Sequence, residues 1–411
     1  MLTPTVLLVI TAVVGLYMAW TIGANDVANA MGTSVGSKAL SHRQAIVVAG
    51  ILEFAGAVLV GTYVTDTVRK GIVDPQMFTV DPTMLVHGMM AALLAAAVWL
   101  HLASSFGWPV STTHSIVGAV AGFGVAAGGF GALHWSKLGL IVASWLISPL
   151  TSGIIAFSIY YAVRRLVIEK ADREAEALRH APLIVAVMTL VLSLVMLFKG
   201  LKNLKLKLLW WQSGGVALLL AALASTLTRR FAWRRPARPD AALQGMERIF
   251  GSLQVVTAAF VAFAHGANDV ANAVGPVAAV FSTLKTGSVL PKVDVPIWIL
   301  VGGGLGIVLG LATYGYRVMA TIGGRITEVT PSRGFAAEFG AALTILVGSK
   351  LGLPLSTTHT LVGAVIGVGF ARGLRALDLS VIRSIALSWV LTIPFAAGVA
   401  LMLYYLLRAL A

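Results

Sequence analysis

Long apolar runs separated by short polar stretches make up nearly the whole chain. Most of these runs reach or approach the roughly 17 to 25 residues that cross a bilayer as a helix. They lie near residues 3–22, 45–65, 84–103, 114–131, 137–163, 183–198, 208–227, 250–265, 296–315, 335–350, 357–371 and 380–407. No long polar stretch is left over for a soluble domain. The pattern therefore predicts an all-α integral membrane protein with about twelve transmembrane helices.

Two charged stretches divide this series of apolar runs. The first runs from Arg164 to His180, and the second opens at Arg229 and Arg230. Two apolar runs lie between them, joined by a Lys-rich connection. We expect three parts: a first transmembrane repeat at 1–163, cytoplasmic linkers with two intervening transmembrane helices at 164–248, and a second transmembrane repeat at 249–411.

Two short motifs occur once in each half and in the same order. The octet Gly-Ala-Asn-Asp-Val-Ala-Asn-Ala occupies 23–30 and again 266–273, and the hexad Pro-x-Ser-Thr-Thr-His occupies 109–114 and 354–359. The two octets and the two hexads are separated by nearly the same length of chain, which indicates a duplicated unit. Five runs in the first repeat and two in the centre make an odd number of crossings. The repeats are therefore predicted to be inverted in the membrane.

Composition and charge refine this picture. Hydrophobic residues make up 58% of the chain and charged residues 11%, while the formal net charge is +14. The basic residues fall in loops, where they set membrane orientation, so no nucleic-acid partner is predicted. If both termini lie outside, most of the 30 Lys and Arg residues lie inside, although the lysines of 199–207 lie outside and weaken this bias.

Three absences in the sequence limit what the chain can be. The chain contains no cysteine, which excludes disulfides, thiolate chemistry and cysteine-ligated metals. The first residues lack the basic region of a cleaved signal peptide, so we interpret them as the first transmembrane helix. No P-loop is present, which disfavours ATP-driven pumping.

Each octet places one Asp and two Asn in otherwise apolar sequence. Ionisable residues are costly inside a membrane and indicate a functional site. Hard cations take oxygen ligands, so we predict a cation site at the octets, with sodium as the hypothesis. The predicted cation-binding residues are Asn25, Asp26, Asn29, Asn268, Asp269 and Asn272.

Glycine and proline near the octets predict that both helices are interrupted there. Gly23, Gly32 and Gly36 lie in or after the first octet, and Gly275-Pro276 follows the second. A break frees backbone groups, which is tolerated in a membrane where they face protein, water or a ligand. Such broken helices meet at a midplane site in transporters. For Gly32 and Gly36, close contact between helices is the alternative.

The hexads predict helix N-termini that attract an anion. Free N–H groups and the positive end of the helix dipole favour negative charge, and three hydroxyl groups add donors. The residues concerned are Ser111, Thr112, Thr113, Ser356, Thr357 and Thr358. Simple capping, with back-bonding of the hydroxyls to the helix, is the alternative. We expect His114 and His359 to hold the broken helices in place rather than to serve a Ser/His hydrolase.

Asp26 and Asp269 would repel the anion that the hexads attract. An uncompensated buried charge is costly, so cations or protons must lie between these groups. Sodium symport provides one solution. Protonated carboxylates, or a substrate that enters as a neutral metal complex, provide another, and spacing does not choose between them. A passive anion channel is disfavoured because it leaves the buried acids without a role.

Two further acidic residues, Glu53 and Glu338, lie in apolar surroundings. They do not occupy the same position in the two repeats, so they do not form one repeated site. Each could bind a coupling ion, or pair with a basic residue or a helix N-terminus. His265 precedes only the second octet and receives no role.

The duplicated octets and hexads resemble those of the inorganic phosphate transporters of the PiT type. This resemblance covers both halves and implies symport of inorganic phosphate by alternating access, without a cofactor and usually as a homodimer, in the inner membrane of the cell. Sodium drives transport in some members and protons, with metal-phosphate, in many bacterial ones. Sulfate permeases with similar motifs keep sulfate as an alternative substrate.

The resemblance also assigns residues. It implies a phosphate and ion site at Asp26, Ser111 to Thr113, Asp269 and Ser356 to Thr358, with the flanking Asn residues, and a part in transport for Glu53 and Glu338. The central region departs from some members of the family because it lacks a large cytoplasmic domain. We therefore expect no regulation through such a domain. As a transporter, the chain is expected to have no enzymatic activity.

Overall fold

The computed structural model describes residues 3–198, 208–232, 245–290, 295–322, 329–373 and 377–410. Within these ranges the regular structure is helical, apart from one isolated bridge between Val73 and Leu133. The first half contains α1 (Pro4–Gly36), α2 (His42–Val60), α3 (Thr62–Lys70), α4 (Pro82–Ser105), α5 (Thr112–Gly128) and α6 (Trp135–Val163). The centre contains α7 (Arg173–Phe198) and α8 (Trp210–Leu227). The second half contains α9 (Gly245–Thr286), α10 (Ile297–Thr313), α11 (Tyr316–Ile322), α12 (Pro331–Lys350), α13 (Thr357–Arg372) and α14 (Leu379–Leu410).

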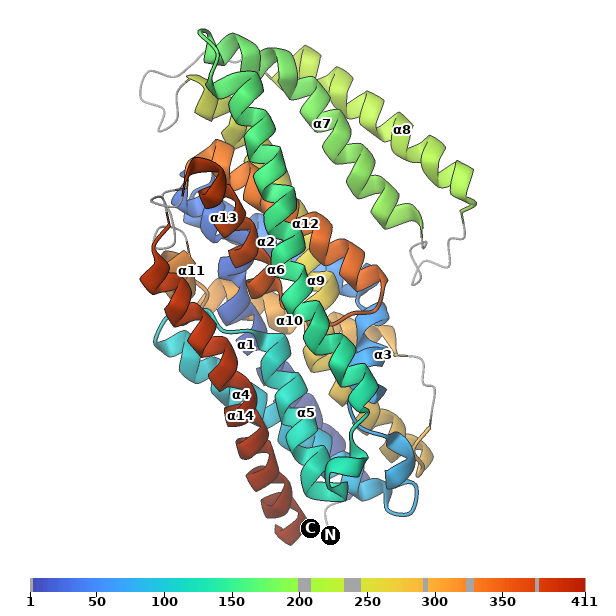
Figure 1. Ribbon diagram of the computed structural model, residues 1–411. Helices are drawn as coiled ribbons and strands as arrows, with labels where there is room; N and C mark the ends of the chain where they lie inside the picture. Colours follow the sequence, from blue (N-terminus) through green and yellow to red (C-terminus); the bar gives the residue numbers. More distant parts are fainter. Residues whose placement is uncertain are drawn as a thin grey trace.

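The helices form an elongated bundle with both termini at one end (Figure 1). α7 and α8 lie side by side at the other end, where α7 packs against α9 and α12. Every apolar run of the sequence corresponds to one of the described helices, and the short helices α3 and α11 continue α2 and α10. Eight of the described helices are long and apolar enough to cross a bilayer. The all-α prediction is confirmed.

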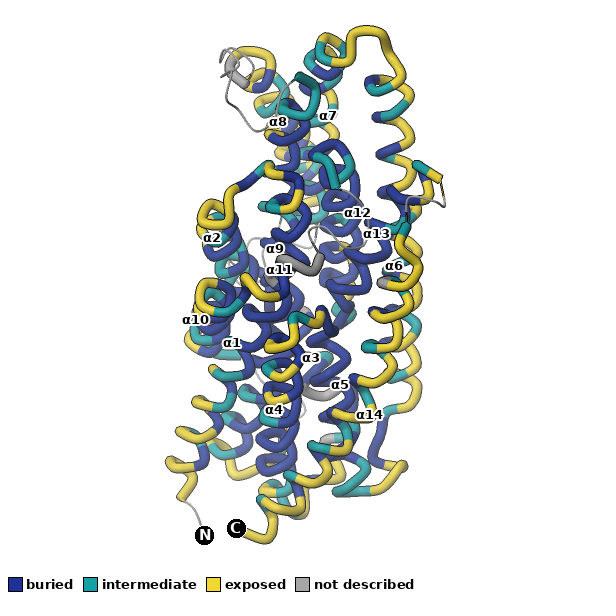
Figure 2. The backbone as a smooth tube through the Cα atoms, turned by 90° about the vertical axis from the view of Figure 1, so that its left-hand side faces the viewer, coloured by how far each residue is buried: buried dark blue, intermediate teal, exposed yellow. Residues whose placement is uncertain are grey.

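Burial follows the requirements of a membrane bundle. Buried residues run down the middle of the molecule, and exposed residues lie on its outside and at its ends (Figure 2). Large apolar side chains are exposed on the outer faces of α6, α8 and α14, among them Leu146, Leu219 and Val390. Apolar residues spread over whole outer faces are suited to contact with lipid rather than water.

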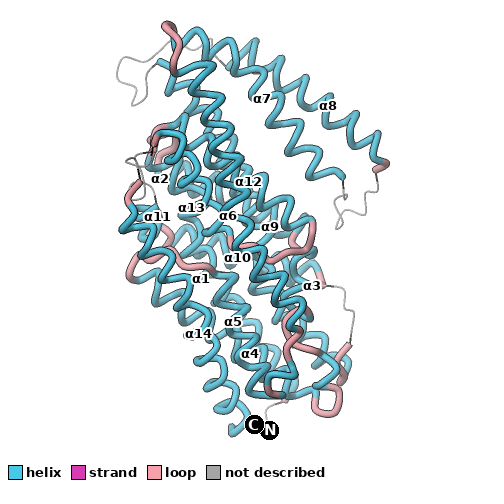
Figure 3. The backbone as a smooth tube through the Cα atoms, viewed as in Figure 1, coloured by secondary structure: helices cyan, strands magenta, loops and turns pink. Residues whose placement is uncertain are grey.

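The order of helices in the first half recurs in the second. α1 and α9 carry the octets, α2 and α10 are each followed by a short continuation, and α6 and α14 close each half. α4 and α5 are joined through the first hexad, as α12 and α13 are through the second. These two connections lie within the length of the bundle rather than at its ends (Figure 3), so each pair of helices forms a hairpin that turns inside the protein.

The two halves are interlocked. The α5 helix of the first hairpin packs against α14, and the α13 helix of the second hairpin packs against α6. Glycine permits both contacts: a Cβ atom at Gly118 would lie 2.9 Å from the carbonyl oxygen of Ile393, and one at Gly363 would lie 2.3 Å from that of Pro149. Each hairpin therefore rests on the last helix of the other half.

The predicted interruption of the octet helices is wrong. α1 continues through Gly23 and Gly32 and ends at Gly36, and α9 continues through Gly275 and Pro276. The broken helices of this fold lie at the hexads instead, where α4 stops at Ser105 and α5 starts at Thr112. Neighbouring helices can hold a membrane helix together across a proline.

The glycine of each octet serves close helix packing. A Cβ atom at Gly23 would lie 1.9 Å from the carbonyl oxygen of Ile307 on α10. At Gly266 it would lie 2.0 Å from the carbonyl oxygen of Glu53 on α2. Both contacts join one half to the other, and both bring an octet helix into backbone contact with its neighbour.

Candidate functional site

The two octets meet at the centre of the protein. Asp26 on α1 and Asp269 on α9 are completely buried. Together with His265 they place three potential ligand atoms within 4.8 Å of one another. The continuous helices α1 and α9 thus bring two carboxylates from distant parts of the chain to one point.

The hexads supply hydroxyl groups to these carboxylates in a symmetric way. Thr112 Oγ1 donates to Asp26 Oδ2 at 2.7 Å, and Thr357 Oγ1 donates to Asp269 Oδ2 at 2.8 Å. Both threonines are the first residue of their helix, α5 or α13. Hydrogen bonds to a charged acceptor are stronger than neutral ones, so each hairpin is held to the octet of its own half.

Further hydrogen bonds join each octet to the hexad of the other half. Asn29 Nδ2 donates to Thr358 Oγ1 at 2.8 Å. Asn272 Nδ2 lies 3.3 Å from the hydroxyl oxygens of both Thr112 and Thr113. The hexads also contact each other, because Thr113 Oγ1 donates to the carbonyl oxygen of Leu355 at 2.9 Å. Octets and hexads therefore form a single polar centre.

The asparagines of the octets fall into two kinds. Asn25 binds the connection of the first hairpin, donating to Ser104 Oγ at 2.9 Å and accepting from the backbone N–H of Val110 at 3.2 Å. The side-chain amide of Asn268 makes the equivalent contact with Ser349 Oγ at 2.9 Å.

The second asparagine of each octet differs in its oxygen. The buried Oδ1 atoms of Asn29 and Asn272 have no hydrogen-bond partner among the described residues. Buried polar atoms are nearly always paired, and these two occupy matching places beside the two Asp residues. Such a pair of oxygens is available to a bound cation.

The serines of the hexads cap their helices. Ser111 Oγ accepts from the backbone N–H of His114 at 3.2 Å, and Ser356 Oγ accepts from that of His359 at 3.2 Å. Ser115 Oγ bonds back to the carbonyl oxygen of Ser111 at 2.9 Å. Capping thus accounts for the serine hydroxyls in this arrangement, whereas the threonine hydroxyls of both hexads take part in the polar centre.

His265 is the residue whose place the sequence did not reveal. Its Nε2 atom lies 2.9 Å from Asp269 Oδ2 and 3.6 Å from Asp26 Oδ2, and its Nδ1 atom lies 3.1 Å from Glu53 Oε1. The available signal was its position one helical turn before Asp269. The first octet has Ile22 at the matching place, so the repeat did not draw attention to it.

Glu53 and Glu338 occupy different surroundings. Glu53 faces His265 and is completely buried. Glu338 on α12 accepts four hydrogen bonds, from Thr33 at 2.6 Å, Ser34 at 2.7 Å, Gln254 at 2.9 Å and Thr257 at 2.7 Å. The structure thus places the two residues in different surroundings.

His114 and His359 lie against each other behind the hexads. Their ring centroids are 4.3 Å apart, and each ring also packs on a tryptophan, His114 on Trp145 at 3.8 Å and His359 on Trp389 at 3.4 Å. No carboxylate among the described residues bonds to either ring, and the neighbouring serines accept from backbone groups. The structure does not assemble the triad of a hydrolase.

Comparison with known proteins agrees with this arrangement. The sequence profile of the phosphate transporter family matches residues 22–400. A protein of Thermococcus kodakarensis described as a phosphate permease is 46% identical over 402 residues, which covers 97% of each chain. The inorganic phosphate transporter 2-1 of Arabidopsis thaliana chloroplasts is 46% identical, over 95% of this chain and 70% of its own.

A solved structure is similar throughout. It is described as the sodium-dependent phosphate transporter, has a TM-score of 0.89 and 39% sequence identity, and the alignment covers 99% of this chain and all of the other. The predicted membrane fold of two inverted repeats with broken helices is therefore confirmed, and the chain is a multi-pass membrane protein.

Proposed function

The chain belongs to the phosphate transporter family, and we propose that it carries inorganic phosphate together with a cation by alternating access. The observation that supports this most directly is the paired contact of Thr112 with Asp26 and of Thr357 with Asp269 at the buried centre. Carboxylates and hydroxyl donors from both halves meet there, at the ends of two hairpins that turn inside the protein.

Phosphate would bind at the N-termini of α5 and α13. In the structure the hydroxyls of Thr112 and Thr357 donate to carboxylates, and bound phosphate would offer competing oxygen acceptors. Backbone N–H groups at a helix N-terminus favour an anion. The proposed substrate-binding residues are Asp26, Ser111, Thr112, Thr113, Asp269, Ser356, Thr357 and Thr358. Ser111 and Ser356 would act through their caps, which orient the helix N-termini toward the substrate.

A cation is required because two carboxylates and phosphate would otherwise repel one another. The unpaired Oδ1 atoms of Asn29 and Asn272, beside Asp26 and Asp269, supply neutral and charged oxygen ligands of the kind hard cations take. Asn25 and Asn268 would act indirectly, by holding the hairpin connections. Sodium is the ion we propose, which agrees with the description of the similar solved structure.

Coupling to protons is the second candidate, and His265 favours it. A proton on this ring would place a positive charge between Asp26, Asp269 and Glu53. The same cluster of one imidazole and two carboxylates could also hold a divalent metal that enters with phosphate. Sulfate is the alternative substrate for the same donors.

The remaining assignments concern the whole molecule. We propose that Glu53, which faces His265, and Glu338 take part in coupling, and that the protein is a homodimer. The three-part division into 1–163, 164–248 and 249–411 follows the repeated order of helices. Both termini lie at one end of the bundle, which supports placing both on the same side of the inner membrane, and the loop charges favour the outside.

The test is uptake of labelled phosphate into proteoliposomes, with sodium, proton and magnesium gradients varied separately and sulfate added as a competitor. We expect accumulation that requires a sodium gradient. Accumulation driven by protons without sodium would favour the second candidate. Equilibration that ignores every gradient would overturn symport in favour of a channel, and strong competition by sulfate would overturn phosphate selectivity.

A further inference from the structure

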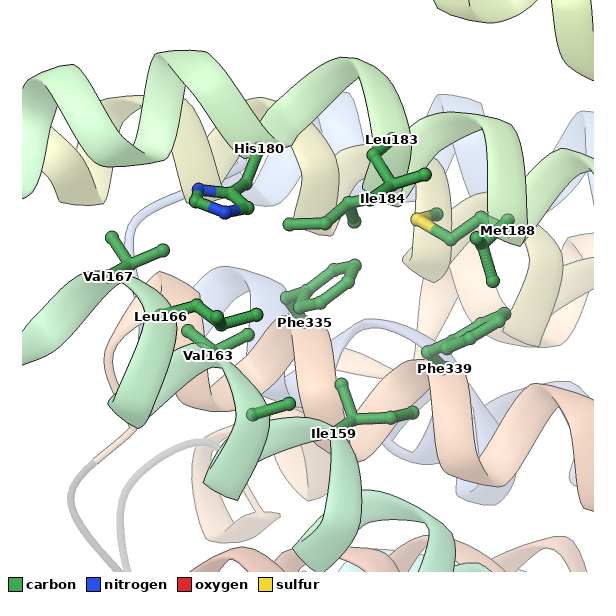
Figure 4. Close-up of a pocket in the computed structure, with 12 residues that line it drawn as sticks. Ile159, Val163, Leu166, Val167, His180, Leu183, Ile184, Met188, Phe335 and Phe339 are labelled. Carbon is green, nitrogen blue, oxygen red and sulfur yellow. The ribbon is translucent and has the colours of Figure 1, made fainter.

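A hollow of about 240 Å³ lies between α7, the end of α6 and α12. Figure 4 shows its walls: Leu183 and Met188 on α7, Ile159 and Val163 on α6, and the rings of Phe335 and Phe339 on α12. Among the residues that line it, His180 is the one polar side chain.

The composition of the walls excludes a polar occupant. Water enters a cavity when several polar groups can bond to it, and apolar cavities stay dry. An empty hollow also deprives its walls of van der Waals contacts. A hydrocarbon chain restores those contacts without needing any hydrogen bond.

The hollow opens sideways toward the region where lipid would lie. Leu183 on its rim is 61% exposed, Leu166 48% and Val187 46%. The helices that carry them, Trp135–Ile168 and Arg173–Leu197, are long and apolar enough to cross a membrane. A lipid chain next to the protein therefore reaches the hollow without crossing a polar barrier.

The two ends of the hollow differ in polarity. Met188 and Phe339 lie at one end, and His180 lies at the other (Figure 4). The His180 ring contacts the carbonyl oxygen of Glu176 at 2.9 Å. The charged segment 164–180 supplies Arg165 and Arg179, both exposed, together with the glutamates that pair with them, Glu169 and Glu176. A molecule with an apolar tail and a charged head matches this gradient.

We propose that the hollow binds one acyl chain of a membrane phospholipid, with its headgroup at the His180 end. The chain would lie between α7 and the second hairpin. Phe335 and Phe339 stack on each other on the side of α12 that lines the hollow, with centroids 6.4 Å apart, while Glu338 between them in sequence bonds to α1 and α9. Lipid would thus brace the helix that carries Glu338.

The test uses protein stripped of lipid in detergent and weighed intact by mass spectrometry after titration with phosphatidylglycerol. We expect saturable binding of one lipid to the wild type. Ala162→Trp, which fills the hollow from α6, should weaken that binding at least about tenfold, while Ala222→Trp on the exposed face of α8 should not change it. Equal binding to all three proteins would overturn the proposal.

A second measurement locates the chain and does not depend on a bulky substitution. Because the protein has no cysteine, Met188→Cys introduces a single thiol at the deep end of the hollow. Phosphatidylglycerol should slow its reaction with a small methanethiosulfonate reagent, and glycerol phosphate, which lacks the chain, should not. Reaction at the same rate with and without the lipid, or protection by glycerol phosphate, would contradict the proposal.

Discussion

The Nε2 atom of His265 lies 2.9 Å from Oδ2 of Asp269, one helical turn away on α9, and both side chains are completely buried. The ring reaches Asp26 and Glu53 as well. The imidazole is thus the group of the protein itself that can supply positive charge among the carboxylates, because no Lys or Arg is found among the groups that contact them in the described structure.

His265→Gln should therefore impair transport. We expect phosphate uptake to fall about tenfold or more, as for the loss of a hydrogen bond to a charged group, and the remaining uptake to lose any dependence on pH between about 5 and 8 that the imidazole confers. Uptake into proteoliposomes across this pH range provides the measurement, with His42→Gln at the exposed start of α2 as the control. An unchanged rate and pH profile would contradict a role for His265.

Asp26→Asn and Asp269→Asn should each abolish coupled uptake. Each change removes a negative charge at the proposed cation site and replaces one acceptor oxygen with an amide donor, which faces the donor Thr112 or Thr357. Counterflow and gradient-driven uptake are the assays, and Asp172→Asn in the exposed connection before α7 is the control. Wild-type accumulation in either variant would show that the carboxylate is not needed for coupling.

The first two hydroxyls of each hexad should have separable effects. Thr112→Val removes the bond to Asp26 and should raise the KM for phosphate about tenfold. Ser111→Ala removes the cap of α5 and should lower the free energy of unfolding by about 1 kcal/mol. Uptake kinetics and thermal unfolding measured on both variants decide this, and a larger rise of KM in Ser111→Ala would reverse the assignment.

Gly266→Ala should prevent normal packing. Its Cβ atom would lie 2.0 Å from the carbonyl oxygen of Glu53, so α9 and α2 would have to move apart. Overpacking typically lowers folding stability by about 1–3 kcal/mol. Because the added Cβ atom would clash with backbone, which moves less easily than a side chain, we expect a loss at or above the upper end of this range. Gly214→Ala on α8, where nothing lies within 4 Å of the added atom, is the matched control. Yield and monodispersity in detergent measure the effect, and equal behaviour of the two variants would refute the close crossing.

The ion pair of Asp81 and Arg408 should make a small, pH-dependent contribution to stability. Hydrogen bonds from Thr83 and Arg408 lower the pKa of the Asp81 carboxyl. The stabilisation is therefore present above the unfolded pKa of about 3.9 and is lost as the pH falls through the lower folded pKa. Asp81→Asn should reduce stability at neutral pH by at most about 1 kcal/mol, because the pair is partly exposed. A difference between wild type and variant that grows on acidification would contradict this account.

The sequence predicted the helices and the duplication well because both depend on repeated local patterns. Apolar runs marked each span, and the exact octets and hexads related the two halves. The position of the breaks was predicted less well. Gly23 and Pro276 suggest a break in isolation, yet α1 and α9 continue because neighbouring helices hold them. Whether glycine loosens a helix or admits a neighbour is decided by tertiary contacts that the local sequence does not contain.

The candidate site was predicted by residue type but not by role. Asn25 and Asn29 look alike in the octet, but Asn25 binds the hairpin connection, whereas the Oδ1 atom of Asn29 has no hydrogen-bond partner in the described part of the chain. His265 lacks a partner in the first repeat, so the comparison of repeats passed over it. Glu338 has Leu93 at the corresponding place, counted back from Ser349 and Ser104. His265 and Glu338, where the two repeats differ, proved to be informative positions. Comparing the repeats does not show which of the many differing positions matter for function.

The exchange of hairpins between the halves has a consequence for biosynthesis. α5 rests on α14 and α13 rests on α6, so the first half lacks its partner surfaces until the end of the chain has been made. Until the second half is made, α5 and α6 therefore lack their packing partners α14 and α13. The hydroxyls of Thr112 and Thr113 likewise lack their contacts with Asn272. Neither half can complete its packing alone, so this topology requires the two halves to fold together rather than independently.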